Sequence, residues 1–156
     1  MMSRFLVAIA CVGSLGFAIP TPSFAIVPVD KSFKMRGQLD VVDSNGNEFI
    51  CEVKMMGKIS KIGIATISSA IFGPENKTCS GPPVATNLPW TMKDYTQSGY
   101  TIKKVGIKGG GIEPCGPAVV GAGAGSRGEI ILSGYAIGSK CHVKHGVLQS
   151  KPEISP

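Results

Sequence analysis

The residues of this sequence with the clearest potential for chemistry are four cysteines, Cys51, Cys79, Cys115 and Cys141. None lies in the Cys-x-x-Cys spacing that structural zinc sites usually have, so we expect two disulfides and neither a metal nor a cofactor. Four cysteines allow three pairings. We favour Cys51 with Cys79 and Cys115 with Cys141 because these pairs close loops of similar length. In the chain-entropy treatment each such loop stabilises the fold by about 3.5 kcal/mol.

The other candidates for chemistry lack the surroundings that a catalytic or cofactor site needs. Residues 123–128 match the G-x-G-x-x-G dinucleotide pattern, but Glu129 opens a strand-like run where that pattern requires a helix. Ser126 lacks the sequence context of a nucleophile elbow and is interpreted as a turn serine. His142 and His145 have an odd spacing, which on a strand predicts opposite faces and excludes a shared ligand. We therefore predict that the protein is not an enzyme.

The elements that must position these residues are short strands. Residues 33–41 alternate between apolar and polar, and Asn45-Gly46 then indicates a hairpin turn into a returning strand at residues 49–55. Further strands are expected at residues 62–72, 100–107, 119–120, 129–137 and 141–148, and residues 79–89 are expected to form a loop or an irregular edge strand. The pattern predicts an all-β fold, a small antiparallel sandwich or barrel held by two disulfides.

Residues 1–25 have the features of a secretory signal peptide. Arg4 supplies a short positive region, a charge-free apolar stretch follows, and Ser23 and Ala25 stand at the −3 and −1 positions. A lipoprotein signal with Cys11 as the modified residue is the alternative, but it leaves an apolar stretch shorter than such signals need. We expect cleavage after Ala25.

Cleavage would leave residues 26–156 as a single all-β secreted domain beginning at Ile26. An even number of cysteines agrees with an extracellular protein, and a periplasmic one is also possible on these grounds. No later apolar stretch has spanning length, so the mature protein is not expected to be membrane-spanning.

The charge and composition of the chain indicate which classes of partner it can bind. The full chain has a net charge of +6, and removal of Arg4 leaves +5. The lysines are scattered and are not interleaved with aromatic residues, which argues against nucleic acid and for weak attraction to anionic surfaces. Charged residues make up 17% of the chain, below the ~25% of ordinary domains. Apolar strands with so few charges can leave an apolar face exposed, and such faces are interaction sites.

The most distinctive stretch is residues 79–92, in which Leu88-Pro89-Trp90 contains the sole tryptophan. It resembles the Cys-then-Leu-Pro-Trp segment of small bacterial secreted proteins described as protein activators of alkane oxidation. Similar elements recur at residues 33–37, 51–57, 115–116, 141–143 and 150–152, so the resemblance covers most of the chain. This sequence departs from those proteins in being Lys-rich where they are Ser/Thr-rich.

The resemblance implies a secreted, non-catalytic β protein that helps cells to use or disperse alkanes, with hydrocarbon or another apolar surface as partner. Leu88, Pro89 and Trp90 are then a possible interface, although the ring of Trp90 can equally be packed in the core. The alternative function is a structural or adhesive module of the matrix or cell surface that self-associates as a homo-oligomer through edge strands.

Overall fold

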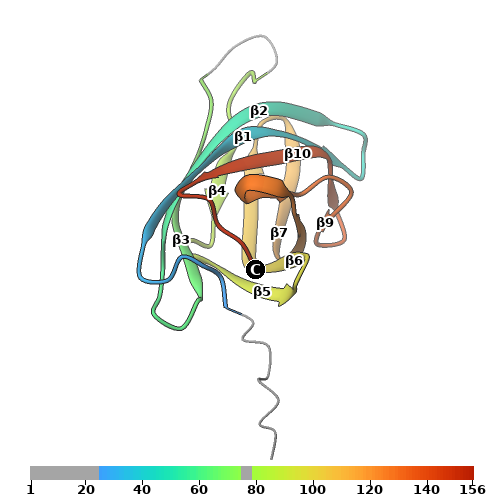
Figure 1. Ribbon diagram of the computed structural model, residues 1–156. Helices are drawn as coiled ribbons and strands as arrows, with labels where there is room; N and C mark the ends of the chain where they lie inside the picture. The colour runs from blue at the N-terminus through green and yellow to red at the C-terminus, as the bar shows by residue number, and fades with distance from the viewer. Residues whose placement is uncertain (1–24, 75–78) are drawn as a thin grey trace, which may run out of the picture.

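In the computed structural model, which describes residues 25–74 and 79–156, the chain forms an antiparallel eight-strand β-barrel (Figure 1). The expected all-β fold is confirmed, and it is a barrel. The predicted signal peptide, residues 1–25, lies outside the described residues except for Ala25. The strands are β1 (Ser32–Asp43), β2 (Glu48–Ile59), β3 (Ala65–Phe72), β4 (Val84–Thr86), β5 (Trp90–Thr96), β6 (Gly99–Gly109), β7 (Ile112–Ala124), β8 (Glu129–Ile131), β9 (Ala136–Ile137) and β10 (Cys141–Lys151).

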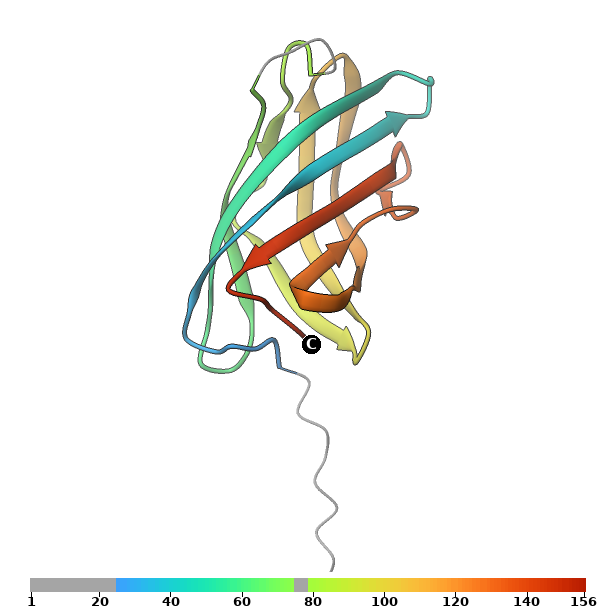
Figure 2. The ribbon, with the colours of Figure 1, turned by 45° about the horizontal axis from the view of Figure 1, so that its top comes forward.

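Pairing between the first and last strands closes the barrel. In β1, Leu39 lies opposite Cys51 of β2 on one side and opposite Gly146 of β10 on the other. The short strands β4 and β5 occupy one position between β3 and β6, and β8 and β9 share the position beside β10. Figure 2 shows β1, β2 and β10 running diagonally across one side of the barrel, with β6 and β7 on the opposite side.

Alternation of apolar and polar residues decides which side chains fill the barrel. Along β1 and β2 the inward residues Met35 and Met55 are buried, whereas Lys34 and Lys54 are exposed. The largest fully buried side chain is Trp90. A cavity beside Trp90 inside the barrel has a volume of about 20 Å³, far below the ~300–1,000 Å³ of sites for small organic ligands. The interior is therefore a packed core.

Two disulfides cross-link the barrel, one from a strand to the segment before β4 and one between two strands. Cys51 of β2 is bonded to Cys79, with a Cα–Cα distance of 4.8 Å, and Cys115 of β7 to Cys141 of β10, at 5.7 Å. The favoured pairing is confirmed. The second bond spans the gap between β7 and β10, where the intervening strands β8 and β9 are short.

Asp43 ties the β1–β2 turn to the start of β7. Its carboxylate accepts hydrogen bonds from the backbone N–H groups of Asn45, Asn47 and Glu113, each at 2.9 Å, and from the Asn47 side chain at 3.0 Å. These donors, above all Glu113, lower the pKa of the buried Asp43 carboxyl to about 2. Gly46 has a φ of 84°, as the expected Asn-Gly turn requires.

Several strands differ from the sequence-based expectation, and the one expected at residues 129–137 is divided into β8 and β9. The strand expected at residues 62–72 begins at Ala65, because Ile62 lies in a turn. The strand β5 was not expected after the loop-like segment, which contains the short β4. β7 begins at Ile112, well before residues 119–120, and both its alternation and its register with β6 are broken at Gly116 and Pro117, where β7 has a bulge.

Candidate functional site

The residues singled out around Trp90 lie at the start of β5. The Trp90 side chain is 2% exposed, and its indole N–H donates a hydrogen bond to the backbone oxygen of Thr86 at 2.8 Å. The ring is therefore packed in the core, and a role of Trp90 in an interface stays a prediction. Leu88 is half-buried and Pro89 exposed. A contact between these two residues and a partner stays a prediction.

The histidines are arranged differently from the expectation. Asp40 pairs with His145 and Val41 with Val143, so a bulge at Lys144 adds one residue to β10. The extra residue resets the alternation, and both His142 and His145 are exposed instead of lying on opposite faces.

The glycine-rich run forms a turn and not a dinucleotide site. Ser126 opens the 3-10 turn η1 (Ser126–Gly128), which leads directly into β8, as the strand-like Glu129 indicated. Among residues 25–74 and 79–156, no group of three or more His, Cys, Asp or Glu side chains is placed to hold a metal ion.

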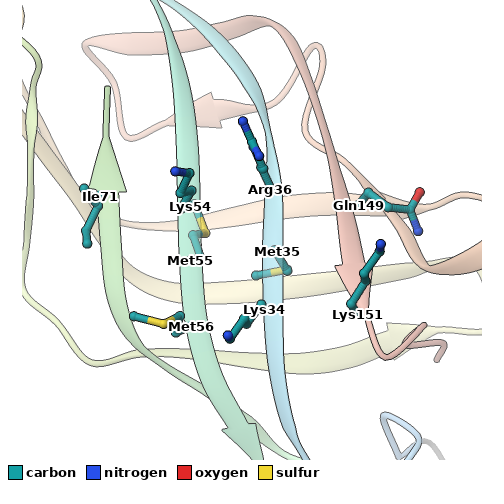
Figure 3. Close-up of a pocket in the computed structure, with 9 residues that line it drawn as sticks. All are labelled: Lys34, Met35, Arg36, Lys54, Met55, Met56, Ile71, Gln149 and Lys151. Atoms are coloured by element: carbon teal, nitrogen blue, oxygen red, sulfur yellow. The ribbon is translucent and has the colours of Figure 1, made fainter. Parts of the chain in front are cut away.

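A groove of about 560 Å³ lies on the outer face of β1, β2, β3 and β10 (Figure 3). We call it the basic groove. Its outward-pointing side chains are mainly long, and they form walls on a sheet whose inward residues Met35 and Met55 belong to the core. The outward lining residues are Lys34, Arg36, Lys54, Met56, Ile71, Gln149 and Lys151.

The strand register arranges these side chains in two parallel rows. One row crosses from Lys151 on β10 to Lys34 on β1 and Met56 on β2. The second row crosses from the polar end at Gln149 to an apolar end, through Arg36, Lys54, Ile71 and Val84. Residues far apart in the sequence thus become neighbours, and charge gives way to apolar surface along the row.

The basic end of the groove carries like charges directly opposite one another. Lys34 faces Lys151, and Arg36 faces Lys54. Such cross-strand pairs are destabilising, because their Cβ atoms lie only ~4.5–5.5 Å apart. Arg36 also forms an ion pair with Glu52 at 3.0 Å. Within the described chain, Lys34, Lys54 and Lys151 form no ion pair. The groove therefore has positive charge that no ion pair compensates among the residues that the structure describes.

The apolar end consists of Met56, Ile71 and Val84, which we call the apolar strip. Their exposed fractions are 41%, 58% and 57%. Ile71 is paired with Lys54 on one side and with Val84 on the other, so the apolar and basic parts are continuous. Contact with an apolar partner would remove this surface from water at a gain of roughly 25 cal/mol per Å².

Comparison with known protein families finds a match over residues 1–155 to the alkane oxidation protein activators described as PraA/PraB-like. The chain belongs to this family. The resemblance drawn from Leu88-Pro89-Trp90 and the accompanying segments is confirmed. Neither the curated proteins nor the solved structures gave a match.

The family description names an activator of alkane oxidation and not an oxidase. Two disulfides are typical of proteins in oxidising, extracytoplasmic compartments. The described residues contain no helical segment with the length and apolar character needed to cross a bilayer.

Sequence reasoning missed the basic groove of this PraA/PraB-like protein. A usable signal was present in Met55-Met56, since consecutive residues of a strand cannot both face the core. The alternation of Lys34 and Arg36 with buried residues also placed two cations on one face. The neighbours across the strands could not be found, because Ile71 and Val84 are placed by the register of β3 with β2 and β4, and Lys151 by barrel closure between β1 and β10.

Proposed function

We propose that this PraA/PraB-like protein is exported and acts without catalysis at the surface of hydrocarbons, which it contacts through the apolar strip. The observation that carries the proposal is the contrast in available apolar space. Ile71 and Val84 are exposed partners across two strands, and Met56 lines the same groove as Ile71, whereas the cavity beside Trp90 inside the barrel has only about 20 Å³. An alkane chain fits on the outside of the barrel and not within it. Contiguous exposed apolar surface is a feature of interaction sites.

Export with cleavage after Ala25 is compatible with the packing of the barrel end. Ile26 is fully buried, and its nitrogen donates a hydrogen bond to the backbone oxygen of Gly63 at 3.0 Å. Cleavage would convert the Ile26 nitrogen into an α-ammonium group, which can still donate this hydrogen bond. The mature protein would therefore retain the contact that fastens its first residue.

The test is emulsification of hexadecane by the purified mature protein. The variant Met56→Ser/Ile71→Thr/Val84→Thr is expected to lose at least about fivefold in emulsifying activity, because it replaces the apolar strip with hydroxyl groups. The matched control is Ile62→Thr/Val119→Thr, which changes exposed apolar residues elsewhere and should retain the activity. Equal losses in both variants, with folding intact by circular dichroism, would show that general surface hydrophobicity acts and would reject the groove.

The non-catalytic part of the proposal has its own test. Ser126→Ala and His142→Ala should each leave emulsification within about twofold of the unchanged protein. A loss above tenfold in either would correspond to about 1.4 kcal/mol at a discrete chemical site, and an enzyme would then be the better interpretation.

Self-association is the second candidate, and the edge of β7 favours it. Beyond its pairing with β6, β7 is paired with β8 at Gly123 and Ala124. The preceding part of β7 could add a strand from another molecule, although Pro117 lies within it and lacks an N–H donor. A sedimentation coefficient that rises with protein concentration would support this role. The variant Val119→Lys, at this edge, should abolish that concentration dependence.

A further inference from the structure

We propose that the basic groove binds a single long-chain carboxylate. The head group lies among Lys34, Arg36, Lys54 and Lys151, and the alkyl chain extends over the apolar strip. This inference rests on the proposed function, in which the same strip contacts hydrocarbon. It adds a defined class of soluble ligand and a role for the basic residues.

The charge arrangement calls for an anion. Two like-charged pairs, Lys34 with Lys151 and Arg36 with Lys54, lie beside one another on three adjacent strands. Glu52 is the carboxylate paired with this set, through Arg36. The nearest acid along the second row is Glu129, which pairs with Gln149 on the far side of β10. An anion placed between the two pairs would be attracted by four cations at once and would relieve their mutual repulsion.

The chemistry of the cations fits a carboxylate. The guanidinium group of Arg36 has a planar set of donors that can bind two carboxylate oxygens together. Lys34, Lys54 and Lys151 supply mobile ammonium groups with three donors each. Gln149 borders this end of the groove, and its amide nitrogen donates a hydrogen bond to the backbone oxygen of Arg127. The head group would thus be held at a solvated site, where it need not be fully desolvated.

The dimensions fit one alkyl chain. From Arg36 through Lys54 and Ile71 to Val84 the second row spans three interstrand steps, roughly 14 Å at ~4.8 Å each. An extended chain of about ten to twelve carbons covers this distance, given C–C bonds of ~1.5 Å in a zigzag. The groove volume of about 560 Å³ is also in the ~300–1,000 Å³ range of small-ligand sites.

Long-chain carboxylates are chemically related to the alkane oxidation that the family description names. Oxidation of the terminal carbon of an alkane leads through an alcohol and an aldehyde to a carboxylate. A protein that contacts hydrocarbon and also binds long-chain carboxylates would engage both ends of that sequence of reactions. The groove offers one surface for both, because its apolar strip accepts the chain and its basic end recognises the oxidised terminus.

The experiment is isothermal titration of the mature protein with decanoate below its micelle concentration, compared with decyltrimethylammonium, which has the same chain and the opposite charge. We expect decanoate to bind with 1:1 stoichiometry and at least tenfold more tightly than the cation. Lys34→Gln/Lys54→Gln should weaken decanoate binding by at least tenfold. The charge-matched control Lys93→Gln/Lys103→Gln, on β5 and β6, should weaken it by less than twofold.

Three outcomes would overturn the inference. One is equal binding of decanoate and decyltrimethylammonium, and another is an equal loss in the groove variant and the charge-matched control. The third is binding to phosphatidylglycerol vesicles without binding to monomeric decanoate, which would indicate a membrane surface as the occupant.

Emulsification of hexadecane separates this inference from the proposed function. The variant Lys34→Gln/Lys54→Gln should still emulsify, because its apolar strip is intact. If decanoate binds as expected while the apolar-strip variant emulsifies normally, the proposed function fails and the carboxylate site stands. If emulsification depends on the strip but decanoate does not bind, the carboxylate site fails alone.

Discussion

The barrel interior and the basic groove are built on the two faces of the same strands, and they differ in what they can accept. Met55 and Met56 are consecutive in β2, yet the first is 4% exposed and the second 41%. Inside, apolar side chains fill the space to a residual cavity of about 20 Å³. Outside, a groove of about 560 Å³ is open to solvent. Apolar side chains on the inner face stabilise the protein, whereas those on the outer face are available to a partner.

Polar residues also have different roles in the interior and in the basic groove. Asp43 is buried, and its carboxylate accepts hydrogen bonds from four donors. The lysines of the groove are exposed and face other cations. A satisfied buried carboxylate fastens two hairpins together, while an unsatisfied cationic surface favours recognition of an anion. Changes to the interior should therefore alter stability, and changes to the groove should alter binding.

The largest effect is expected from removing the Trp90 ring. Trp90→Ala should lower the free energy of unfolding by about 3–5 kcal/mol, because it leaves a cavity in the core and removes the hydrogen bond to the backbone oxygen of Thr86. Urea unfolding followed by circular dichroism measures this loss. The matched control is Tyr95→Ala, which removes a 72% exposed ring and should change stability by less than about 0.5 kcal/mol. A small effect of Trp90→Ala would contradict the packed interior.

Removing the disulfide between β7 and β10 should lower the free energy of unfolding by a similar or slightly smaller amount. Cys115→Ser/Cys141→Ser is expected to cost about 3.5 kcal/mol in unfolding free energy, since the loop it closes becomes free in the unfolded chain. Thermal unfolding of the variant gives the measurement. Thiol titration of the unchanged mature protein in denaturant without reductant should read near zero, and two free thiols per chain would disprove the cross-links.

Asp43 should give the protein a specific dependence on acid. Its pKa is about 2 in the folded state and ordinarily 3.8, so its contribution to stability is complete above pH 4 and is lost as the pH falls toward 2. Asp43→Asn should be less stable at pH 7 and should show a flatter decline between pH 4 and 2. Unfolding midpoints across this range test the effect, and an unchanged decline in the variant would refute it.

The smallest effect on stability is expected in the groove. Lys54→Gln removes a like charge opposite Arg36 and should raise the unfolding free energy by about 0.2–1 kcal/mol. The gain should shrink in high salt, which screens exposed charges. Glu52→Gln, which removes the partner of Arg36, is the opposing control and should be slightly destabilising. A loss of stability in Lys54→Gln would mean that the lysine has an attractive partner.

The sequence predicted much of the fold because its signals are local. Alternation placed Phe33 and Met35 inside β1, and Asn45-Gly46 located the first hairpin. The pairing of Cys51 with Cys79 followed from the lengths of the loops. The start of β7 was missed because Gly116 and Pro117 break the alternation of buried and exposed residues there. β5 was missed because it follows directly on the Pro-rich segment that was expected to form a loop or an irregular edge strand.

The candidate site was less predictable because it depends on register. The bulge at Lys144 reversed the expectation for the histidines, since one inserted residue changes which face every later side chain occupies. The approach of Lys151 to Lys34 requires closure between the first and last strands, which no local pattern encodes. Trp90 drew attention as the sole tryptophan, yet large apolar rings are as useful to a core as to an interface.

The most direct test of the central claim, that alkyl chains contact the outside of the barrel, uses its methionines as probes. Met56 lies in the groove, whereas Met35, Met55 and Met92 are buried. Mature protein with ¹³C-labelled methionine methyl groups would be titrated with hexane-saturated buffer and followed by NMR. We predict that the Met56 methyl resonance shifts while the other three stay unchanged. A shift of Met35, Met55 or Met92 with Met56 unaffected would place the hydrocarbon inside the barrel and contradict the account.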